Sequence, residues 1–194
     1  MRVCVFDFDG TLTTRDTLLS LIACTRGKWG LVGCLLRYSP QLVLMKLGLY
    51  ANWRVKEHVF GHCFGGLTMQ EFNAICRQYA LSHRHLLRSA AMEYIDKVLA
   101  EGDQVLVVSA SMESWVRPFF TDERIKVTGT RPEMTDGRLT GRLDGRNCYG
   151  EEKVERIRQL FPDRASYTLV AFGDSRGDRE MLSYADEAHY QPFR

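Results

Sequence analysis

The sequence predicts an α/β protein with helices packed on both faces of a central parallel sheet. Short apolar runs of the length of buried strands alternate with segments of helical periodicity along most of the chain. Four such runs are residues 3–6, 105–108, 125–127 and 169–172. Because parallel strands are joined by helical crossovers, this alternation indicates a Rossmann-like three-layer core.

A long helical stretch follows the first strand and interrupts the alternation. Helical signals run from about residue 16 to residue 81, which is too long for an ordinary crossover connection. The TMQE motif at residues 68–71 is a capping box and predicts a helix start at Thr68. We therefore predict two parts, a core of residues 1–14 and 84–194 and an inserted α-helical cap of residues 15–83.

The second half of the chain supplies the remaining elements of the core. Apolar residues from Leu87 to Val98 recur at three- and four-residue steps, which predicts an amphipathic helix that ends near Gly102. The pattern also predicts a helix over residues 113–120, a β-ribbon over residues 138–142 and a last strand near residues 187–190.

Composition sets broad limits on the class of protein. The 194 residues are 45% hydrophobic and 26% charged, which is typical of a globular protein with a packed core. The formal net charge of +2 gives no indication of a nucleic-acid partner. Six cysteines without a C-x-x-C pair favour reduced thiols, and we expect a cytoplasmic protein.

Residues 29–50 form an unusually apolar segment. A membrane-spanning helix needs roughly 20 nearly uncharged residues, but Arg37, Pro40 and Lys46 interrupt this one. We expect a helical hairpin broken at Ser39-Pro40 instead. Contact of the segment with a membrane surface stays open as a less favoured alternative, because so apolar a segment has to pack against something.

Polar residues follow several of the predicted strands. Asp7 and Asp9 come after the first strand, Ser109 after the second, and Asp174 and Asp178 after the fourth. A further candidate, Lys153, lies in the first turn of a predicted helix that begins near residue 150. Because ligands of open α/β sheets bind beyond the carboxyl ends of the strands, we expect these side chains to converge at one edge.

A cluster of carboxylates is unfavourable unless something neutralises its charge. Mg²⁺ does so with oxygen ligands, and a substrate phosphate can complete its coordination. Lys153 is suited to hold a phosphate oxygen, and the backbone N–H groups after Asp7 and Ser109, including those near Gly10 and Ala110, are further donors. In this interpretation Asp7 attacks phosphorus, while Asp9 protonates the leaving alcohol and later activates water.

Four sequence elements, in this order, resemble the motifs of the haloacid dehalogenase superfamily. Residues 7–13 (DFDGTLT) are similar to its first motif, residues 107–109 (VVS) to its second, Lys153 to its third, and residues 173–178 (GDSRGD) to its fourth. Together they bracket almost the whole chain. An aspartate two places after the nucleophile is typical of the phosphatases of that superfamily rather than its dehalogenases.

The resemblance also implies a role for each matching residue. Asp7 is the implied nucleophile and a metal ligand, and Asp9 is the implied acid/base, which binds the metal through its backbone carbonyl. Ser109 and Lys153 are implied to hold the phosphate. Asp174 is implied to bind Mg²⁺, and Asp178 to do so directly or through water.

A helical cap between the first and second motifs resembles the phosphoserine-phosphatase-like branch. An acidic residue nine places after the nucleophile can contact the substrate amine in that branch, and Asp16 stands there, where glutamate is usual. Asp16 is equally well suited to cap a helix. Gly10 replaces a serine common in phosphoserine phosphatases, and the cap is unusually apolar, as in bacterial phosphatidylglycerophosphate phosphatases of the same branch.

We therefore predict a Mg²⁺-dependent phosphatase that hydrolyses a phosphate monoester through an aspartyl-phosphate on Asp7. The expected partner is a small phosphorylated substrate, either phosphoserine-like or a lipid phosphate such as phosphatidylglycerophosphate. Two alternatives stay open: a phosphotransferase, and a receiver-type signalling protein that is phosphorylated on aspartate without turnover. The inserted cap and the late GDSRGD element argue against a receiver.

Overall fold

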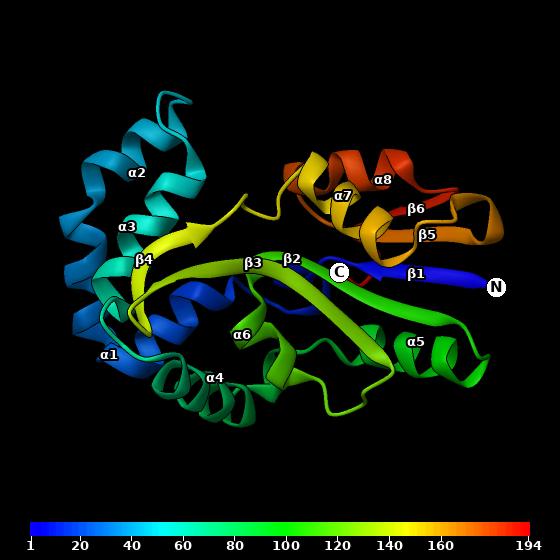
Figure 1. The fold of residues 1–194 in the computed structure, drawn as a ribbon, viewed down its shortest axis with the longest axis horizontal. Coiled ribbons are helices and arrows are strands. Elements are labelled where there is room, and N and C mark those ends of the chain that lie inside the picture. Colours follow the sequence, from blue (N-terminus) through cyan, green and yellow to red (C-terminus); the bar gives the residue numbers. More distant parts are fainter.

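A computed structural model describes residues 1–194 of the protein. Its six strands form one sheet. The strands lie in the order β4-β3-β2-β1-β5-β6 (Figure 1). Five of them are parallel, and β4 pairs with β3 in the antiparallel sense. Their bounds are Arg2–Phe6 for β1, Gln104–Met112 for β2, Ile125–Thr135 for β3, Arg138–Asp144 for β4, Thr168–Gly173 for β5 and Glu187–Tyr190 for β6.

Helices cover both faces of the sheet, which explains why its central strands are apolar without alternation. Val3 and Val5 face α7 (Glu151–Leu160) and α8 (Arg179–Tyr184), whereas Cys4 and Phe6 belong to the larger core cluster on the opposite face. That opposite face carries α5 (Ser89–Ala100) and α6 (Glu113–Val116) (Figure 1). The predicted three-layer α/β fold is therefore confirmed.

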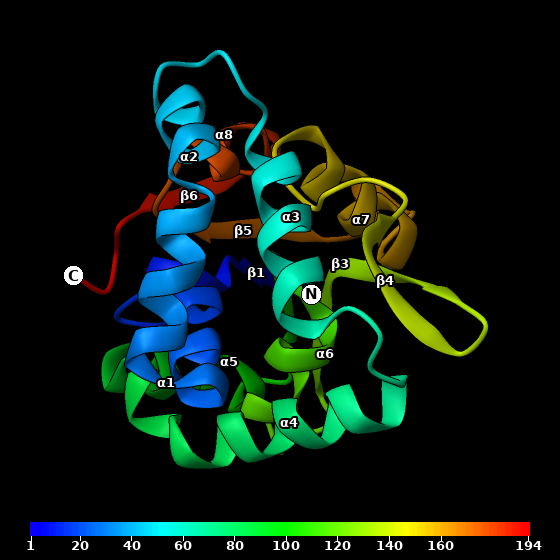
Figure 2. The ribbon, with the colours of Figure 1, turned by 90° about the vertical axis from the view of Figure 1, so that its left-hand side faces the viewer.

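Four helices separate β1 from β2 along the chain: α1 (Thr17–Arg37), α2 (Ser39–Lys46), α3 (Asn52–Phe64) and α4 (Met69–Ser82). α1, α2 and α3 stand beyond one end of the sheet, where they lie side by side (Figures 1 and 2). α4 instead packs against α6 and the short turn Arg117–Phe119, below the sheet. The division into a core and a cap of residues 15–83 stays a prediction, and α4 is the part of that range closest to the core.

This helical region is broken at several points, and the helix start predicted at Thr68 is confirmed. Gly27 has a φ of 73° and kinks α1, and α1 gives way to α2 at Tyr38. Thr68 caps α4 with a complete capping box, in which its hydroxyl accepts from the amide of Glu71 at 3.2 Å. The expected hairpin at Ser39-Pro40 is wrong in one respect. The chain bends there but continues as one column, and it reverses only in residues 47–51, before α3 (Figure 2).

The sheet is larger than its apolar runs predicted. β2 continues beyond Ser109 to Met112 through an irregularity in its pairing with β3. β3 is 11 residues long and turns at Asp136 and Gly137, both at positive φ, into β4. The predicted helix over residues 113–120 is divided between α6 and the short turn that contains Pro118.

Two glycines allow α3 to pack directly on the β3–β4 hairpin. A Cβ added to Gly141 would lie 2.4 Å from the Cα of Gly61, and a Cβ on Gly61 would lie 3.2 Å from the Cα of Gly141. The carboxylate of Glu57 on α3 accepts from the amide of Leu143 at 2.9 Å. This close contact fixes α3 against the sheet extension.

We expect Gly141→Ala to lower the free energy of unfolding by about 2–4 kcal/mol, because it adds a clash with α3 to the strain of a left-handed alanine. Gly145→Ala is the matched control, since Gly145 also has a positive φ but no atom within 4 Å of an added Cβ. Urea unfolding of both variants measures the difference. Equal losses of stability would contradict the proposed close packing of α3.

Candidate active site

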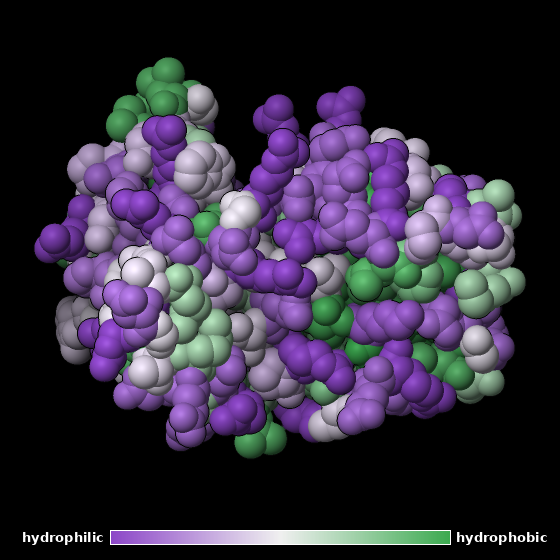
Figure 3. All heavy atoms as spheres, viewed as in Figure 1, coloured by the Kyte–Doolittle hydropathy of each residue, from purple (hydrophilic) through white to green (hydrophobic).

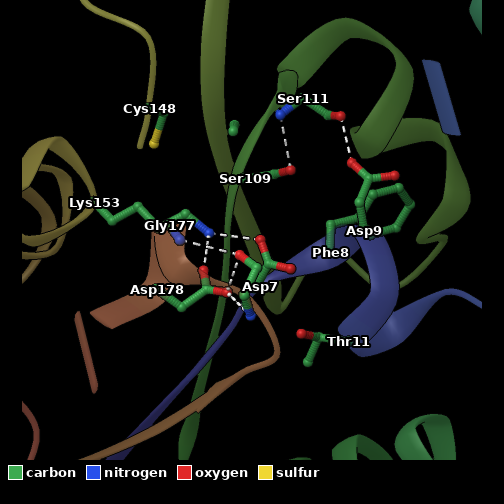
Figure 4. Close-up of polar contacts among 12 residues, drawn as sticks. Asp7, Phe8, Asp9, Thr11, Ser109, Ser111, Cys148, Lys153, Gly177 and Asp178 are labelled. Carbon is green, nitrogen blue, oxygen red and sulfur yellow. Dashed lines mark hydrogen bonds and ion pairs between the residues drawn. The ribbon is translucent and has the colours of Figure 1, made fainter. Parts of the chain in front are cut away.

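Lys153 joins two acidic segments at the carboxyl edge of the sheet (Figure 4). Its Nζ donates to Oδ1 of Asp7 at 2.5 Å and to Oδ1 of Asp178 at 2.6 Å, and all three side chains are buried. Asp7 follows β1, Lys153 lies in the first turn of α7, and Asp178 ends a short turn after β5. The predicted convergence of these elements is therefore seen in the structure.

The ion pairs set the charge state of the group. Burial acts to lower the pKa of Lys153, but the two carboxylates outweigh it and raise the pKa above its ordinary value. Burial raises the pKa of Asp7 to about 7, against the opposing effect of Lys153. Burial also acts to raise the pKa of Asp178, yet Lys153 and hydrogen bonds from Ser175 bring it below its usual range.

The backbone around Asp178 holds its carboxylate in place. Oδ2 accepts from the amide of Asp174 at 3.1 Å, and from the amide and hydroxyl of Ser175 at 2.9 and 2.8 Å. A Cβ on Gly173 would lie 2.6 Å from the Cβ of Asp178, so only glycine fits before Asp174. The GDSRGD element thus folds into a turn whose donors aim one carboxylate at Lys153.

Asp7, Asp174 and Asp178 form a candidate metal site. Each offers one carboxylate oxygen, and these oxygens lie within 4.8 Å of one another. Three oxygen donors in such a group fit a hard divalent cation such as Mg²⁺. Burial raises the pKa of Asp174 as well, so a cation would relieve the cost of charging this cluster. The side chain of Arg194 also forms an ion pair with Asp174.

Gly10 lies directly against the carboxylate of Asp174 in this cluster. It has a φ of 84°, and a Cβ there would lie 2.4 Å from Oδ2 of Asp174. Its amide donates to Oγ1 of Thr13 at 3.2 Å, and the hydroxyl of Thr11 lies 3.5 Å from Oδ1 of Asp174. The glycine of the DFDGT motif is therefore required by close approach of Asp174, whereas its predicted contact with phosphate stays a prediction.

Asp9 points away from the carboxylate cluster (Figure 4). Its Oδ1 accepts from the amide and hydroxyl of Thr17 at 2.7 and 2.6 Å, and its Oδ2 accepts from the hydroxyl of Ser111. Burial raises the pKa of Asp9, with a further increase from Asp16, and the bonds from Ser111 and Thr17 oppose it. A raised pKa suits a group that both gives and takes a proton. The predicted role of its carbonyl as a metal ligand stays a prediction.

Ser109 and Ala110 lie within β2, not beyond its end. The hydroxyl of Ser109 is buried and accepts from the amide of Ser111 at 3.0 Å. The carbonyl of Ala110 accepts from Nζ of Lys56 at 2.5 Å and from the hydroxyl of Thr130 at 2.8 Å. This part of the site is thus held by contacts from β3 and from helix α3.

Lys56 is a site residue that no sequence pattern indicated. It projects from α3 and also donates to Oδ1 of Asn147 at 3.3 Å. Burial lowers its pKa, and Asp9 and Asp16 oppose this effect. Nothing near Lys56 in the sequence marks it, because its partners are more than fifty residues away along the chain. Thr17 and Ser111, the partners of Asp9, were not selected from the sequence either, although Thr17 is only eight residues from Asp9.

Asp16 serves as a helix cap in this structure. Its exposed side chain accepts from the amide of Leu19 at 3.2 Å, at the start of α1. It also lines the cavity above Asp7 and Asp9. The capping interpretation is therefore observed, and a contact with substrate stays a prediction.

One cavity of about 410 Å³ contains these groups. Its polar lining includes Asp7, Asp9, Ser109, Lys153 and Asp178. Most of its apolar lining comes from α1, α2 and α3. These apolar lining residues are Leu18, Leu19, Ile22, Leu31, Cys34, Leu35, Leu42, Met45, Val55 and Val59. A polar floor under an apolar enclosure is typical of a site for a small organic ligand.

The sequence matches the haloacid dehalogenase-like hydrolase family over residues 4–183. The chain belongs to this family. The predicted family is therefore confirmed, as is the prediction that the chain is a hydrolase. All four motifs that carried the resemblance lie within the matched range, and their residues surround the cavity.

Several known proteins are similar along nearly the whole chain. Protein CicA of Caulobacter vibrioides is 34% identical over 192 residues, which cover 97% of this chain and 85% of CicA. A protein of unknown function from Bordetella pertussis Tohama I has a TM-score of 0.80 at 23% identity, covering 95% of this chain and 86% of its own. A substrate-bound phosphoserine phosphatase has a TM-score of 0.66 at 18% identity, covering 97% and 85%. The solved structures share the fold, in agreement with the predicted phosphoserine-phosphatase-like branch.

We expect Lys153→Met to lower the free energy of unfolding by about 3–5 kcal/mol, because it leaves two buried carboxylates without their cation. Lys97→Met is the matched control, since Lys97 is exposed on α5 and its ion pair with Glu101 is at the surface. The control should change stability by less than ~0.5 kcal/mol. Urea unfolding in the absence of added divalent cation measures both values. A loss for Lys153→Met no larger than for the control would contradict the stabilising role of the pair.

Proposed function

We propose that this protein is a Mg²⁺-dependent phosphatase that hydrolyses a phosphate monoester through an aspartyl-phosphate on Asp7. The observation that carries the proposal is the position of Asp7 in the cavity lining, where its carboxylate pairs with Lys153 and lies close to Asp174 and Asp178, the other members of the candidate metal site. Family membership supports hydrolysis, and the phosphatases among proteins of this fold support phosphate as the group transferred.

The phosphoryl group would enter between the ammonium and hydroxyl groups of the floor. Asp7 and Asp178 raise the pKa of Lys153 and so favour its ammonium form, which can bind a phosphate oxygen, and Ser109 offers a hydroxyl from β2. A bound Mg²⁺, held by Asp7, Asp174 and Asp178, would neutralise charge on the carboxylates and on the phosphate. Such neutralisation is necessary because two anions have to meet when Asp7 attacks phosphorus.

In the proposed reaction Asp7 accepts and then releases the phosphoryl group, while Asp9 gives and then takes a proton. A carboxylate oxygen of Asp7 forms a bond to phosphorus, the bond to the ester oxygen breaks, and the proton of Asp9 passes to the leaving alcohol. Asp9 then takes a proton from water, whose oxygen attacks phosphorus and releases inorganic phosphate from Asp7. Hydrogen bonds from Thr17 and Ser111 hold the Asp9 carboxylate for both transfers.

The cavity favours a leaving group with an apolar part. Its enclosure by α1, α2 and α3 offers many aliphatic contacts and few charges. A lipid phosphate such as phosphatidylglycerophosphate therefore fits better than a small polar alcohol. A phosphoserine-like substrate is the second candidate, because Lys56 and Asp16 also line the cavity and could face a carboxylate and an amine.

We expect Asp7→Asn to reduce the kcat for p-nitrophenyl phosphate at least ~10⁴-fold, because the amide cannot form the aspartyl-phosphate. Release of p-nitrophenol with added Mg²⁺ and with excess EDTA is the measurement. Asp122→Asn, a change at a half-buried aspartate that does not line the cavity, is the control and should keep wild-type turnover. Wild-type hydrolysis by Asp7→Asn would refute the nucleophile, and full wild-type turnover in EDTA would refute the metal.

Turnover by the wild type also separates a phosphatase from a receiver, and assays with glycerol as acceptor would reveal a phosphotransferase.

The apolar enclosure predicts a dependence on chain length. For a series of n-alkyl phosphates, kcat/KM should rise up to about fourfold per methylene, since each buried methylene contributes about 0.8 kcal/mol, until the cavity is full. Leu35→Asn should flatten the series, while Leu81→Asn, at an exposed position on α4, should leave it unchanged. A flat series with the wild type, together with efficient hydrolysis of phosphoserine, would favour the second candidate.

A further inference from the structure

Large apolar side chains are exposed along the outer side of the α1–α2 column and at its tip. Trp29 is 87% exposed, Leu36 68%, Leu47 66% and Leu49 73%. We define the apolar outer surface as these four residues together with Val32 and Val43. Figure 3 shows hydrophobic atoms gathered at the tip, beyond α2. So many exposed large side chains on neighbouring turns indicate a surface that has a partner.

The same column is apolar on its inner side. Leu31, Leu35, Leu42 and Met45 point into the cavity, whereas Trp29, Val32 and Leu36 are exposed at steps of three and four residues. One helical column therefore carries two apolar faces. The inner face is explained by the proposed function, and the outer face is not.

The charge of this region identifies the partner. From Thr17 to Lys56 the sequence contains six lysines and arginines and no aspartate or glutamate, although the whole chain has a net charge of only +2. Lys28, Arg37, Lys46 and Arg54 are exposed in this stretch, and exposed Trp53 follows the tip. Exposed apolar side chains, tryptophans and cations without any acidic residue match a membrane surface that contains anionic lipid.

The geometry favours a helix that lies on the membrane over one that spans it. By length and composition alone, α1 is long and apolar enough to cross a bilayer. However, Gly27, at a φ of 73°, divides it into two halves of ten residues, each about 15 Å long against a hydrocarbon core of about 30 Å. Arg37 and the α1–α2 junction then interrupt the column again. Its inner side also lines the cavity.

We propose that the apolar outer surface docks this protein on membranes that contain anionic lipid. The docking brings the helices that line the cavity to the bilayer, which is where a phosphate monoester of a lipid would be found. The identity of such a substrate rests on the proposed function, whereas the docking itself depends only on the outer surface. The two can therefore fail separately.

Co-sedimentation with vesicles tests the docking. The wild type should bind vesicles in which about one third of the phosphatidylcholine is replaced by phosphatidylglycerol, and should bind less as salt is raised, as expected for interfacial cations. The triple change Trp29→Gln, Leu36→Gln and Leu49→Gln should weaken binding about tenfold or more, through loss of interfacial burial. The triple change Lys28→Glu, Arg37→Glu and Lys46→Glu should abolish the preference for anionic vesicles. Leu81→Gln, which alters an equally exposed leucine on α4, is the control and should bind like the wild type.

Turnover of p-nitrophenyl phosphate by the same samples keeps the outcomes distinct. Both triple variants alter exposed residues outside the cavity, so they should keep this soluble activity, which also shows that they fold. A wild type that hydrolyses the ester but ignores every vesicle would overturn the docking and leave the phosphatase intact. A wild type that binds vesicles without hydrolysis would overturn the phosphatase alone. A stable dimer that the glutamine variant converts to a monomer, without vesicle binding, would assign the surface to a second copy and overturn the docking.

Discussion

The ammonium of Lys153 between two buried carboxylates is the interaction on which the site depends. Without it, Asp7 and Asp178 would face one another in a nearly dry environment, where like charges are costly. The fold makes the contact possible because the ends of β1 and β5 are adjacent in the sheet and α7 begins beside them. The strand order thus brings the two buried carboxylates together, and the charge of Lys153 makes their burial possible. The other groups of the site lie around this ion pair.

The chemistry of the site divides between two sides of Asp7. On one side, buried acids and a single ammonium leave a group whose remaining charge suits a divalent cation. On the other, Asp9 is held by two hydroxyls and an amide in surroundings that raise its pKa. Two aspartates separated by one residue thus have different environments because the chain turns directly after Asp7, and Asp9 lies within that turn, Phe8–Leu12. That difference is what a nucleophile and a proton carrier require.

Sequence patterns predicted the centre of the sheet and the motif residues, because the signals for both lie within short segments of the chain. Strands such as β1 are buried on both faces and therefore appear as continuous apolar runs, and the acids that follow them are read in the same segment. The second half of β3 was missed because Gly129, Pro132 and several polar residues hide the strand pattern where β3 leaves β2 and continues along β4. Lys56 was missed because its partners are brought to it by the packing of α3 on the β3–β4 hairpin, for which the two facing glycines leave no readable signal.

The bond from Lys56 to the carbonyl of Ala110 joins a helix that lines the cavity to a central strand of the sheet. Ala110 lies in β2 beside Ser109, and Lys56 belongs to α3, which encloses the cavity. Any displacement of α3 by more than an ångström or so breaks this bond, since hydrogen bonds weaken steeply with distance. Because its contacts with the β3–β4 hairpin hold α3 in place, the bond from Lys56 also keeps the peptide next to Ser109 fixed relative to the cavity wall. One side chain, that of Lys56, thus links the helix that encloses the cavity to the strand that carries Ser109.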